Sequence, residues 1–263
     1  MARVCEKSNE PVAVGKANRG AVTGAHLSAF AESVATAVEL ITHADPVLRR
    51  TVALSLAVSA TATLYAAGLG LALGAWLAVA RFPGHRLLVL LLNTLLALPS
   101  VVVGLVVYLL LSRSGPLGSW GILFTPAAMV IAQTILVLPV IAALTRQLVG
   151  DSLRDGGDQL RSMGAGPMLC ALLMLVHDRW AVLTVLIAAF GRAIAEVGAV
   201  MVVGGNIDGI TRVMTTSIAL ETSKGDLPLA MALGIVLLAV VGVVNVAIGL
   251  AQRGHGSALA GVR

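Results

Sequence analysis

Residues 51–80 read TVALSLAVSATATLYAAGLGLALGAWLAVA, thirty consecutive positions without a charged side chain. A helix of this length can cross the roughly 30 Å of hydrocarbon in a bilayer. Four further segments have the same character, near residues 87–111, 122–145, 180–203 and 228–250. Because lipid offers the backbone no hydrogen-bond partner, we expect an all-α membrane protein with five transmembrane helices.

The composition of the whole chain supports a place in the membrane. Of the 263 residues, 58% are hydrophobic and 12% are charged, which leaves too little polar surface to enclose a soluble globule. The net charge of +5 does not indicate a nucleic-acid partner, because the basic residues are scattered and aromatic residues make up only 3%. Two cysteines, Cys5 and Cys170, cannot build a disulfide framework.

The N-terminal region differs from this apolar pattern. Residues 22–42 are apolar only in patches, because His26, Glu32 and Glu39 interrupt them. This pattern predicts an amphipathic helix along the membrane interface, and a sixth span over the same residues stays open. The expected parts are a polar tail with an interfacial helix (1–45), a transmembrane domain (46–250) and a short cytoplasmic tail (251–263).

Arginine and lysine are unevenly divided between the two sides of the predicted bundle. With five crossings, eight arginines fall on one side: Arg81, Arg86, Arg146, Arg154, Arg161, Arg179, Arg253 and Arg263. Only Arg113, Arg212 and Lys224 fall on the other. Short cytoplasmic loops carry the excess of positive charge, so the first side is predicted to face the cytoplasm and the N-terminus to lie outside. The basic residues between Arg3 and Arg50 fit that orientation poorly, and a sixth span would relieve part of the conflict.

Small and helix-breaking residues recur inside the spans. Gly70 and Gly74 form a GxxxG pair, which is typical of close helix packing in membranes. Pro99, Pro126 and Pro139 are expected to interrupt the second and third spans and to free backbone carbonyl groups. Such carbonyls could line a polar pathway or belong to ordinary proline kinks, and the sequence favours neither.

The fourth span carries two charged residues, Arg192 and Glu196, four positions apart. An isolated charge there would cost at least about 2.5 kcal/mol, so we expect the two side chains to pair on one helical face. The pair could simply lock one helix to another. Alternatively, it lines or gates a polar path, with Arg192 attracting a passing anion and Glu196 restraining it.

The segment after the fourth span is rich in glycine and hydroxyl groups. It begins Gly204-Gly-Asn206, and six threonines and serines follow between residues 210 and 226. Backbone amides around Asn206, threonine hydroxyls and Arg212 could hydrogen-bond an oxyanion. A solvated loop with a short amphipathic helix explains the same composition, and no spacing here is specific for a ligand.

Residues 146–179 interrupt the apolar pattern with charge and glycine. The Gly156-Gly157 pair should break the preceding helix, Asp158 is a good N-cap, and Gly164 suits a C-terminal cap. The Gly166-Pro167 pair then permits a turn and starts the next helix. The predicted product is a short helix across the cytoplasmic mouth of the bundle, where a soluble partner could push.

This insert also resembles a known signature. An acidic residue, five others and then glycine, in the last large cytoplasmic loop before two final spans, look like the coupling helix of ABC-importer permease subunits. Residues 81–118 and 191–226 resemble the molybdate, sulfate and tungstate branch, through segments such as Asn93-Thr-Leu-Leu-Ala-Leu-Pro99 and Gly191-Arg-Ala-Ile-Ala-Glu196. Residues 191–226 are most similar to the tungstate type, and the resemblance covers roughly residues 46–250.

The resemblance implies roles and partners. In such permeases the coupling helix docks in a groove of a cytoplasmic ATPase, which gives this role to Asp158, Gln159, Leu160, Arg161 and Gly164. The translocation path or gate would include Arg192, Glu196 and Asn206. The family works as a homodimer in the lipid of the bacterial or archaeal cytoplasmic (inner) membrane. Its partners are an ABC ATPase subunit, which binds ATP and Mg, and an extracytoplasmic oxyanion-binding protein.

The chain departs from the family at two places. Asp158-Gln159-Leu160 stands where the commonest cassette has Glu-Ala-Ala, and Val176-His177 replaces an expected proline, which suggests docking tuned to one dedicated ATPase. The chain has no GxxxxGK[ST] phosphate loop, so we expect a translocation subunit that is not itself an enzyme. His177 has no histidine or cysteine at helical spacing, so no metal site is expected.

The sequence leaves alternatives for the transported anion and for the class of function. Tungstate is the expected cargo, with molybdate and sulfate as alternatives, and this order rests on the resemblance alone. A passive channel or a membrane scaffold is the alternative from another class. A membrane-embedded enzyme would need a polar catalytic set that Arg192 and Glu196 do not supply.

Overall fold

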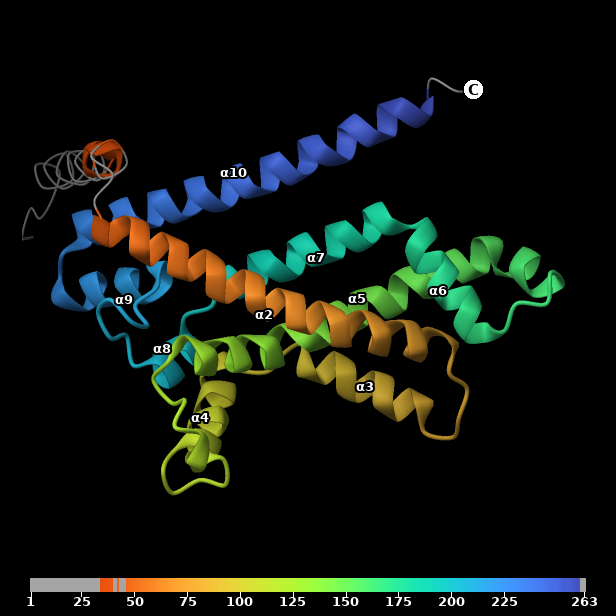
Figure 1. Ribbon diagram of the computed structural model, residues 1–263, viewed down its shortest axis with the longest axis horizontal. Coiled ribbons are helices and arrows are strands. Elements are labelled where there is room, and N and C mark those ends of the chain that lie inside the picture. The colour runs from red at the N-terminus through yellow and green to blue at the C-terminus, as the bar shows by residue number, and fades with distance from the viewer. Residues whose placement is uncertain (1–33, 40–41, 43–45, 261–263) are drawn as a thin grey trace, which may run out of the picture.

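The computed structural model describes residues 34–39, 42 and 46–260. All regular structure in these ranges is helical, so the predicted all-α class is confirmed (Figure 1). The elements are α2 (Pro46–Val79), α3 (His85–Leu95), α4 (Ser100–Leu111), the 3-10 turn η1 (Gly118–Trp120), α5 (Pro126–Ser162), α6 (Pro167–His177), α7 (Arg179–Ile194), α8 (Gly198–Gly204), α9 (Met214–Lys224) and α10 (Leu227–Ala260). The helix predicted at 22–42 lies mostly outside the described residues, although 34–39 are helical.

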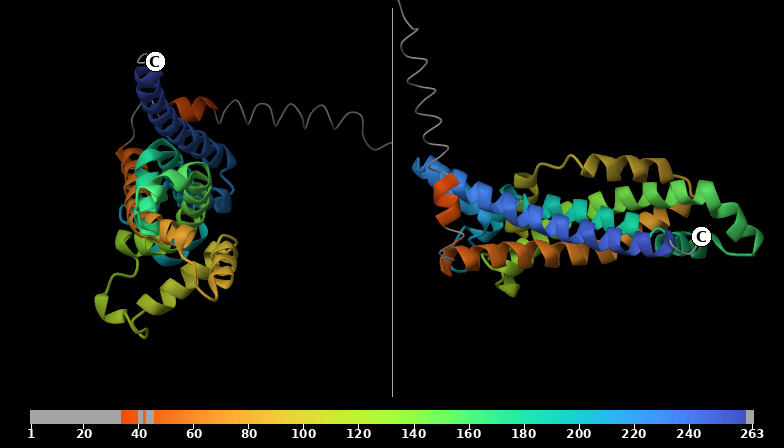
Figure 2. Two further views of the ribbon diagram at one scale, coloured as in Figure 1. Left: turned by 90° about the vertical axis from the view of Figure 1, so that its right-hand side faces the viewer. Right: turned by 90° about the horizontal axis from the view of Figure 1, so that it is seen from above.

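Helices α2 and α5 form the centre of the bundle and lie side by side along most of their length (Figures 1 and 2). Glycine permits their close approach. A Cβ atom on Gly74 would lie 2.6 Å from the carbonyl oxygen of Ala142, and one on Gly70 would lie 2.9 Å from Cβ of Ile141. The close packing predicted from the GxxxG pair is therefore confirmed.

Three helices in the described residues are long and apolar enough to cross a membrane: α2, α5 and residues 227–246 of α10. Two bent pairs bring the number to as many as five by length and composition. These pairs are α3 with α4, which meet at 98°, and α6 with α7, which meet at 78°. Five spans were predicted, but the second one is not a continuous helix. α10 also continues into the predicted tail as far as Ala260.

Of the three prolines that were expected to interrupt spans, one does so. Pro99 precedes α4 at the bend from α3, because it has no N–H to continue the helix before it. Pro126 is the first residue of α5 and starts that helix, so it interrupts nothing. Pro139 is buried inside α5, which continues past it to Ser162. Only Pro99 breaks a predicted span.

The two ends of the bundle carry different elements (Figure 1). One end, which we call the arginine-rich end, holds the connection from α2 to α3, the turn from α5 to α6 and the last part of α10. The opposite end holds the start of α2 together with α8, α9 and the start of α10. Arg81 and Arg154 therefore lie at one end and Arg212 and Lys224 at the other, as the charge count predicted.

Candidate functional site

The fourth predicted span is broken inside the bundle. α7 ends at Ile194 and α8 begins at Gly198, so the expectation of one helix over 180–203 is wrong. Gly198 explains part of the break, because a Cβ there would lie 2.7 Å from Oγ of Ser100 at the start of α4. α8 thus packs against α4 more closely than a larger residue would allow.

Side chains from two other helices pair with the backbone at this break. Nε2 of Gln133 in α5 donates to the carbonyl oxygen of Ala193 at 3.1 Å. The hydroxyl of Thr215 in α9 donates to the carbonyl oxygen of Glu196 at 2.9 Å. The Ala193 carbonyl also accepts from the backbone N–H of Glu196 at 3.2 Å, whereas Thr215 supplies the donor to the Glu196 carbonyl. An unpaired carbonyl group in an apolar bundle would cost several kcal/mol, so the Thr215 bond helps the span to be interrupted there. Thr215 was predicted only as one of the hydroxyl groups of the segment after the fourth span, and Gln133 was not singled out, although a glutamine within the apolar segment 122–145 was a visible signal.

Glu196 turns into the protein. It is only 7% exposed, and its Oε1 accepts a hydrogen bond from the backbone N–H of Ala199 at 3.2 Å. The carboxylate therefore lies at the N-terminus of α8, where a negative charge complements the helix dipole. Its observed role is to hold the start of α8 in place.

The predicted pairing of Arg192 with Glu196 on one helical face is wrong within this chain. The ion pairs among the described residues involve neither of them. The break is the physical reason, because α7 ends before Glu196 and the carboxylate bonds to α8 instead. Sequence spacing alone could not reveal this, since a four-residue interval predicts a shared face only in an unbroken helix.

Arg192 is exposed near the middle of the bundle. The next residue, Ala193, is buried against Ala66 of α2 and Val137 of α5, about halfway along both transmembrane segments. A guanidinium exposed to lipid at that depth would cost at least about 2.5 kcal/mol. Arg192 therefore requires water or another protein surface in front of it.

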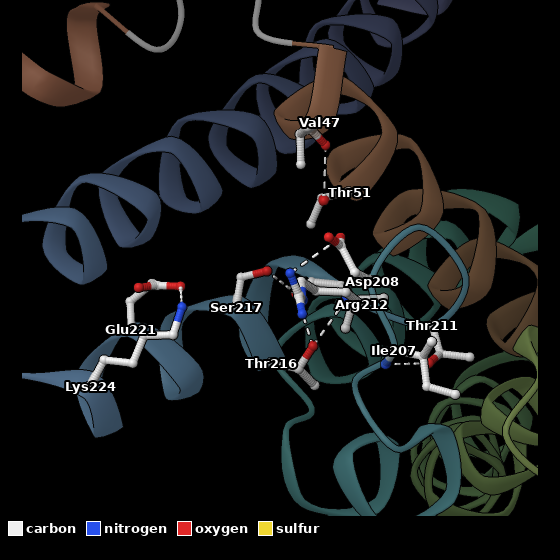
Figure 3. Close-up of polar contacts among 11 residues, drawn as sticks. Val47, Thr51, Ile207, Asp208, Thr211, Arg212, Thr216, Ser217, Glu221 and Lys224 are labelled. Carbon is white, nitrogen blue, oxygen red and sulfur yellow. Dashed lines mark hydrogen bonds and ion pairs between the residues drawn. The ribbon is translucent and has the colours of Figure 1, made fainter. Parts of the chain in front are cut away.

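The glycine- and hydroxyl-rich segment after α8 uses its polar groups internally (Figure 3). The Thr211 hydroxyl donates to the carbonyl of Gly204, and the hydroxyls of Thr216 and Ser217 both donate to the carbonyl of Val213. Arg212 pairs with Asp208 at 3.2 Å. Nε of Arg212 is buried without a hydrogen-bond partner among the described residues, so oxyanion binding by this segment stays a prediction. α9 supplies the short helix of the alternative prediction.

Asn206 differs from its neighbours in this segment. It has a positive φ of 50° and directly follows Gly205, which has a φ of 69°. Its Oδ1 is buried and accepts no hydrogen bond in the described part of the chain. The predicted path residues therefore have different environments: Arg192 is exposed, Glu196 is buried at the start of α8, and Asn206 lies just after the end of α8.

The coupling cassette is the last turn of a long helix. α5 continues through Gly156 and Gly157 to Ser162, so the predicted short separate helix and the N-cap role of Asp158 are wrong. Glycine costs a helix only about 1 kcal/mol per residue relative to alanine. Burial of one face of α5 against α6, in a cluster that includes Leu153, Leu160 and Met174, keeps the helix continuous.

The end of α5 matches the predicted cap. Gly164 has a φ of 84° and donates to the carbonyl of Arg161, while Ala165 donates to the carbonyl of Leu160. These two bonds form a Schellman motif. α6 then begins at Pro167, as predicted. Asp158 and Arg161 form an exposed ion pair at 3.1 Å, and Met163 projects into solvent with 82% of its surface exposed.

A hydrogen bond connects the coupling end to the next span. Asp178 lies between α6 and α7 at their 78° bend, and its Oδ2 accepts a hydrogen bond from the hydroxyl of Ser152 in α5. This contact was not predicted. Among the described residues, no three histidine, cysteine, aspartate or glutamate side chains are placed to hold a metal ion.

Known proteins with similar sequences support a family assignment. The chain is 42% identical over 223 residues to the tungstate uptake system permease protein TupB of Peptoclostridium acidaminophilum, covering 83% of this chain and 96% of that protein. The chain belongs to the tungstate-type branch of ABC-transporter permeases. No model of a protein family matches it.

Two further relatives extend this assignment. A probable anion ABC transporter permease protein of Haloferax volcanii is 43% identical over 198 residues, covering 73% of this chain and 85% of that protein. The sulfate transport system permease protein CysW of Escherichia coli K12 is 36% identical over 148 residues, covering 52% of this chain and 50% of that protein. The predicted resemblance to the oxyanion branch is confirmed, and this permease is a multi-pass membrane protein.

Proposed function

We propose that this permease subunit imports tungstate, driven by ATP that a separate ABC ATPase subunit hydrolyses with Mg²⁺. The observation that carries the proposal is the 42% identity to a permease named for tungstate uptake, which extends over nearly all of that protein. The proposed complex is a homodimer of this chain in the cytoplasmic (inner) membrane, with two ATPase subunits and an extracytoplasmic binding protein. High affinity for the anion would reside in the binding protein.

Arg192 is the residue that we propose lines the anion path. Its exposure in the last turn of α7, near the middle of the bundle and without a carboxylate partner among the described residues, supports contact with water or with the second copy. A tungstate dianion would meet its positive charge there. Glu196 contributes indirectly by fixing α8, and Asn206 marks the outer end of that helix.

The end of α5 is the proposed point of attachment for the ATPase. Asp158, Gln159, Arg161 and Gly164 are exposed at the tip of this helix, and Leu160 packs inward. Movement of this tip would reach α7 through the hydrogen bond between Ser152 and Asp178. α7 leads to Arg192 and to the break, so closure of the ATPase would be coupled to alternating access of the path.

Competitive uptake tests both the cargo and the role of the chain. Tungstate accumulation would be measured in cells that carry or lack this chain, with excess molybdate or excess sulfate as competitor. We expect loss of the chain to abolish uptake and molybdate to compete poorly. Strong competition by molybdate or sulfate would reassign the cargo within the family. Unchanged uptake without the chain would reject tungstate import, and uptake without the ATPase would favour a passive channel.

A further inference from the structure

The arginine-rich end contains a groove of about 1220 Å³ between the end of α2, the start of α3 and the facing parts of α5 and α6. Its charged lining is strongly basic. Four arginines, Arg81, Arg146, Arg154 and Arg161, face a single acidic residue, Asp158. We call this feature the arginine groove.

Two of the four arginines already have acidic partners. Arg154 pairs with Asp151 at 3.0 Å and Arg161 pairs with Asp158 at 3.1 Å. Arg81 and Arg146 pair with no carboxylate among the described residues. The uncompensated positive charge of the groove therefore lies at Arg81, just after the end of α2, and at Arg146 in α5.

Arg146 also has an unsatisfied donor. Its Nε is buried and has no hydrogen-bond partner among the described residues. Buried donors are almost always paired in folded proteins, and a charged donor left unpaired is more costly than a neutral one. The described residues therefore leave Nε of Arg146 without an acceptor.

Part of the lining of the arginine groove is apolar and exposed. Trp76 and Met168 line it, and Trp76 is 42% exposed and stacks on Phe82 with ring centroids 5.6 Å apart. Tryptophan is enriched where a membrane meets water. Arg146 lies at the same height, because Gly74 of α2 packs against its backbone nitrogen. A ligand here would have both a negative group and an apolar part.

We propose that Arg81 and Arg146 bind the phosphate group of an anionic phospholipid, whose apolar part lies along Trp76 and Met168. A guanidinium matches the geometry of a tetrahedral oxyanion group and can donate two parallel hydrogen bonds to it. Basic pockets between helices at the cytoplasmic face of a membrane suit such headgroups. The bound lipid would lie between α2 and the coupling end of α5. This inference does not depend on the cargo.

Native mass spectrometry of the transporter, purified together with its ATPase, tests the proposal. The probes are phosphatidylglycerol and phosphatidylcholine at matched concentrations. We expect phosphatidylglycerol to be retained and phosphatidylcholine to be lost. Arg146→Gln and Arg81→Gln should each weaken retention of phosphatidylglycerol by about tenfold or more, which is the effect of losing one charge-assisted hydrogen bond. Arg179→Gln is the control, because Arg179 is exposed at the same end but does not line the groove.

Further arms decide the source of the bound group. Displacement of phosphatidylglycerol by the same concentration of inorganic phosphate or tungstate would identify a site for soluble oxyanions and overturn the lipid assignment. Equal retention by Arg146→Gln and Arg179→Gln would overturn the site itself. If Arg146→Gln does not assemble, Arg146→Lys keeps the charge but removes the planar fork, and we expect intermediate retention. Lipid binding is measured without transport, so this test and the uptake test fail separately.

Discussion

At the scale of single residues, Arg192 gives the sharpest test of the proposed path. Arg192→Gln removes the positive charge and keeps a polar side chain, so we expect tungstate uptake to fall by about tenfold or more, as for loss of one charge-assisted contact. Arg192→Lys should retain part of the activity. Arg113→Gln is the control, since Arg113 is also exposed but lies in the loop after α4. Normal uptake by Arg192→Leu, at normal protein abundance, would remove this residue from the path.

The hydroxyl of Thr215 should contribute measurably to the stability of the break. Thr215→Val keeps the shape but leaves the Glu196 carbonyl without its donor, and such a loss costs about 1 to 3 kcal/mol. We expect a lower midpoint in thermal unfolding of the purified protein. Thr184→Val is the matched control, because the Thr184 hydroxyl is exposed and bonds only to Trp180 in its own helix. Equal midpoints for the two variants would show that the break does not need this bond.

The polar contacts at the break show which features of the site can be predicted from the sequence. The presence of costly charges in the fourth span was visible, and so was the left-handed cap at Gly164. Their partners were not, because Gln133 and Thr215 reach the break from helices that are distant in sequence. A pair of charges four residues apart predicts a contact only if the helix between them is intact, and here it ends at Ile194.

At the scale of helices, the contact between α2 and α5 depends on Gly74. A methyl group there would meet the Ala142 carbonyl at 2.6 Å and Cβ of Thr145 at 2.7 Å, and neither atom belongs to a flexible side-chain end. Gly74→Ala should therefore destabilise the bundle by about 1 to 3 kcal/mol, the usual cost of overpacking. Gly68→Ala is the control on the same helix, because its Cβ would meet nothing within 4 Å. We expect that variant to be neutral or slightly more stable in thermal unfolding.

The helices also show why some sequence patterns gave wrong predictions of where a helix breaks. The apolar pattern predicted the apolar segments well, because it depends on composition over twenty positions. The described residues hold three helices able to cross a membrane, or up to five if each bent pair is one span. The break of the second span was expected at Pro99, and the break of the fourth span was not predicted. Conversely, Gly156-Gly157 was expected to end α5, and the buried contacts of Leu153 and Leu160 with α6 outweighed the local cost. Breaks were therefore missed where packing produces them and expected where packing prevents them.

At the scale of the whole molecule, the property to test is the proposed coupling of ATP hydrolysis to transport through the tip of α5. Gly164 adopts a left-handed conformation with a φ of 84°, and a Cβ there would meet nothing within 4 Å. Gly164→Leu would strain the backbone by about 1 to 2 kcal/mol and add bulk at the proposed docking surface, and Arg161→Glu would reverse its charge without straining the cap. We expect both variants to lower tungstate uptake far more than ATP hydrolysis, measured together in proteoliposomes containing the assembled transporter. Gly166→Ala is the matched control, because Gly166 has an ordinary extended backbone with a φ of −68° and equal free space. Unchanged ratios of uptake to hydrolysis in both variants would mean that the tip of α5 does not transmit the closure of the ATPase.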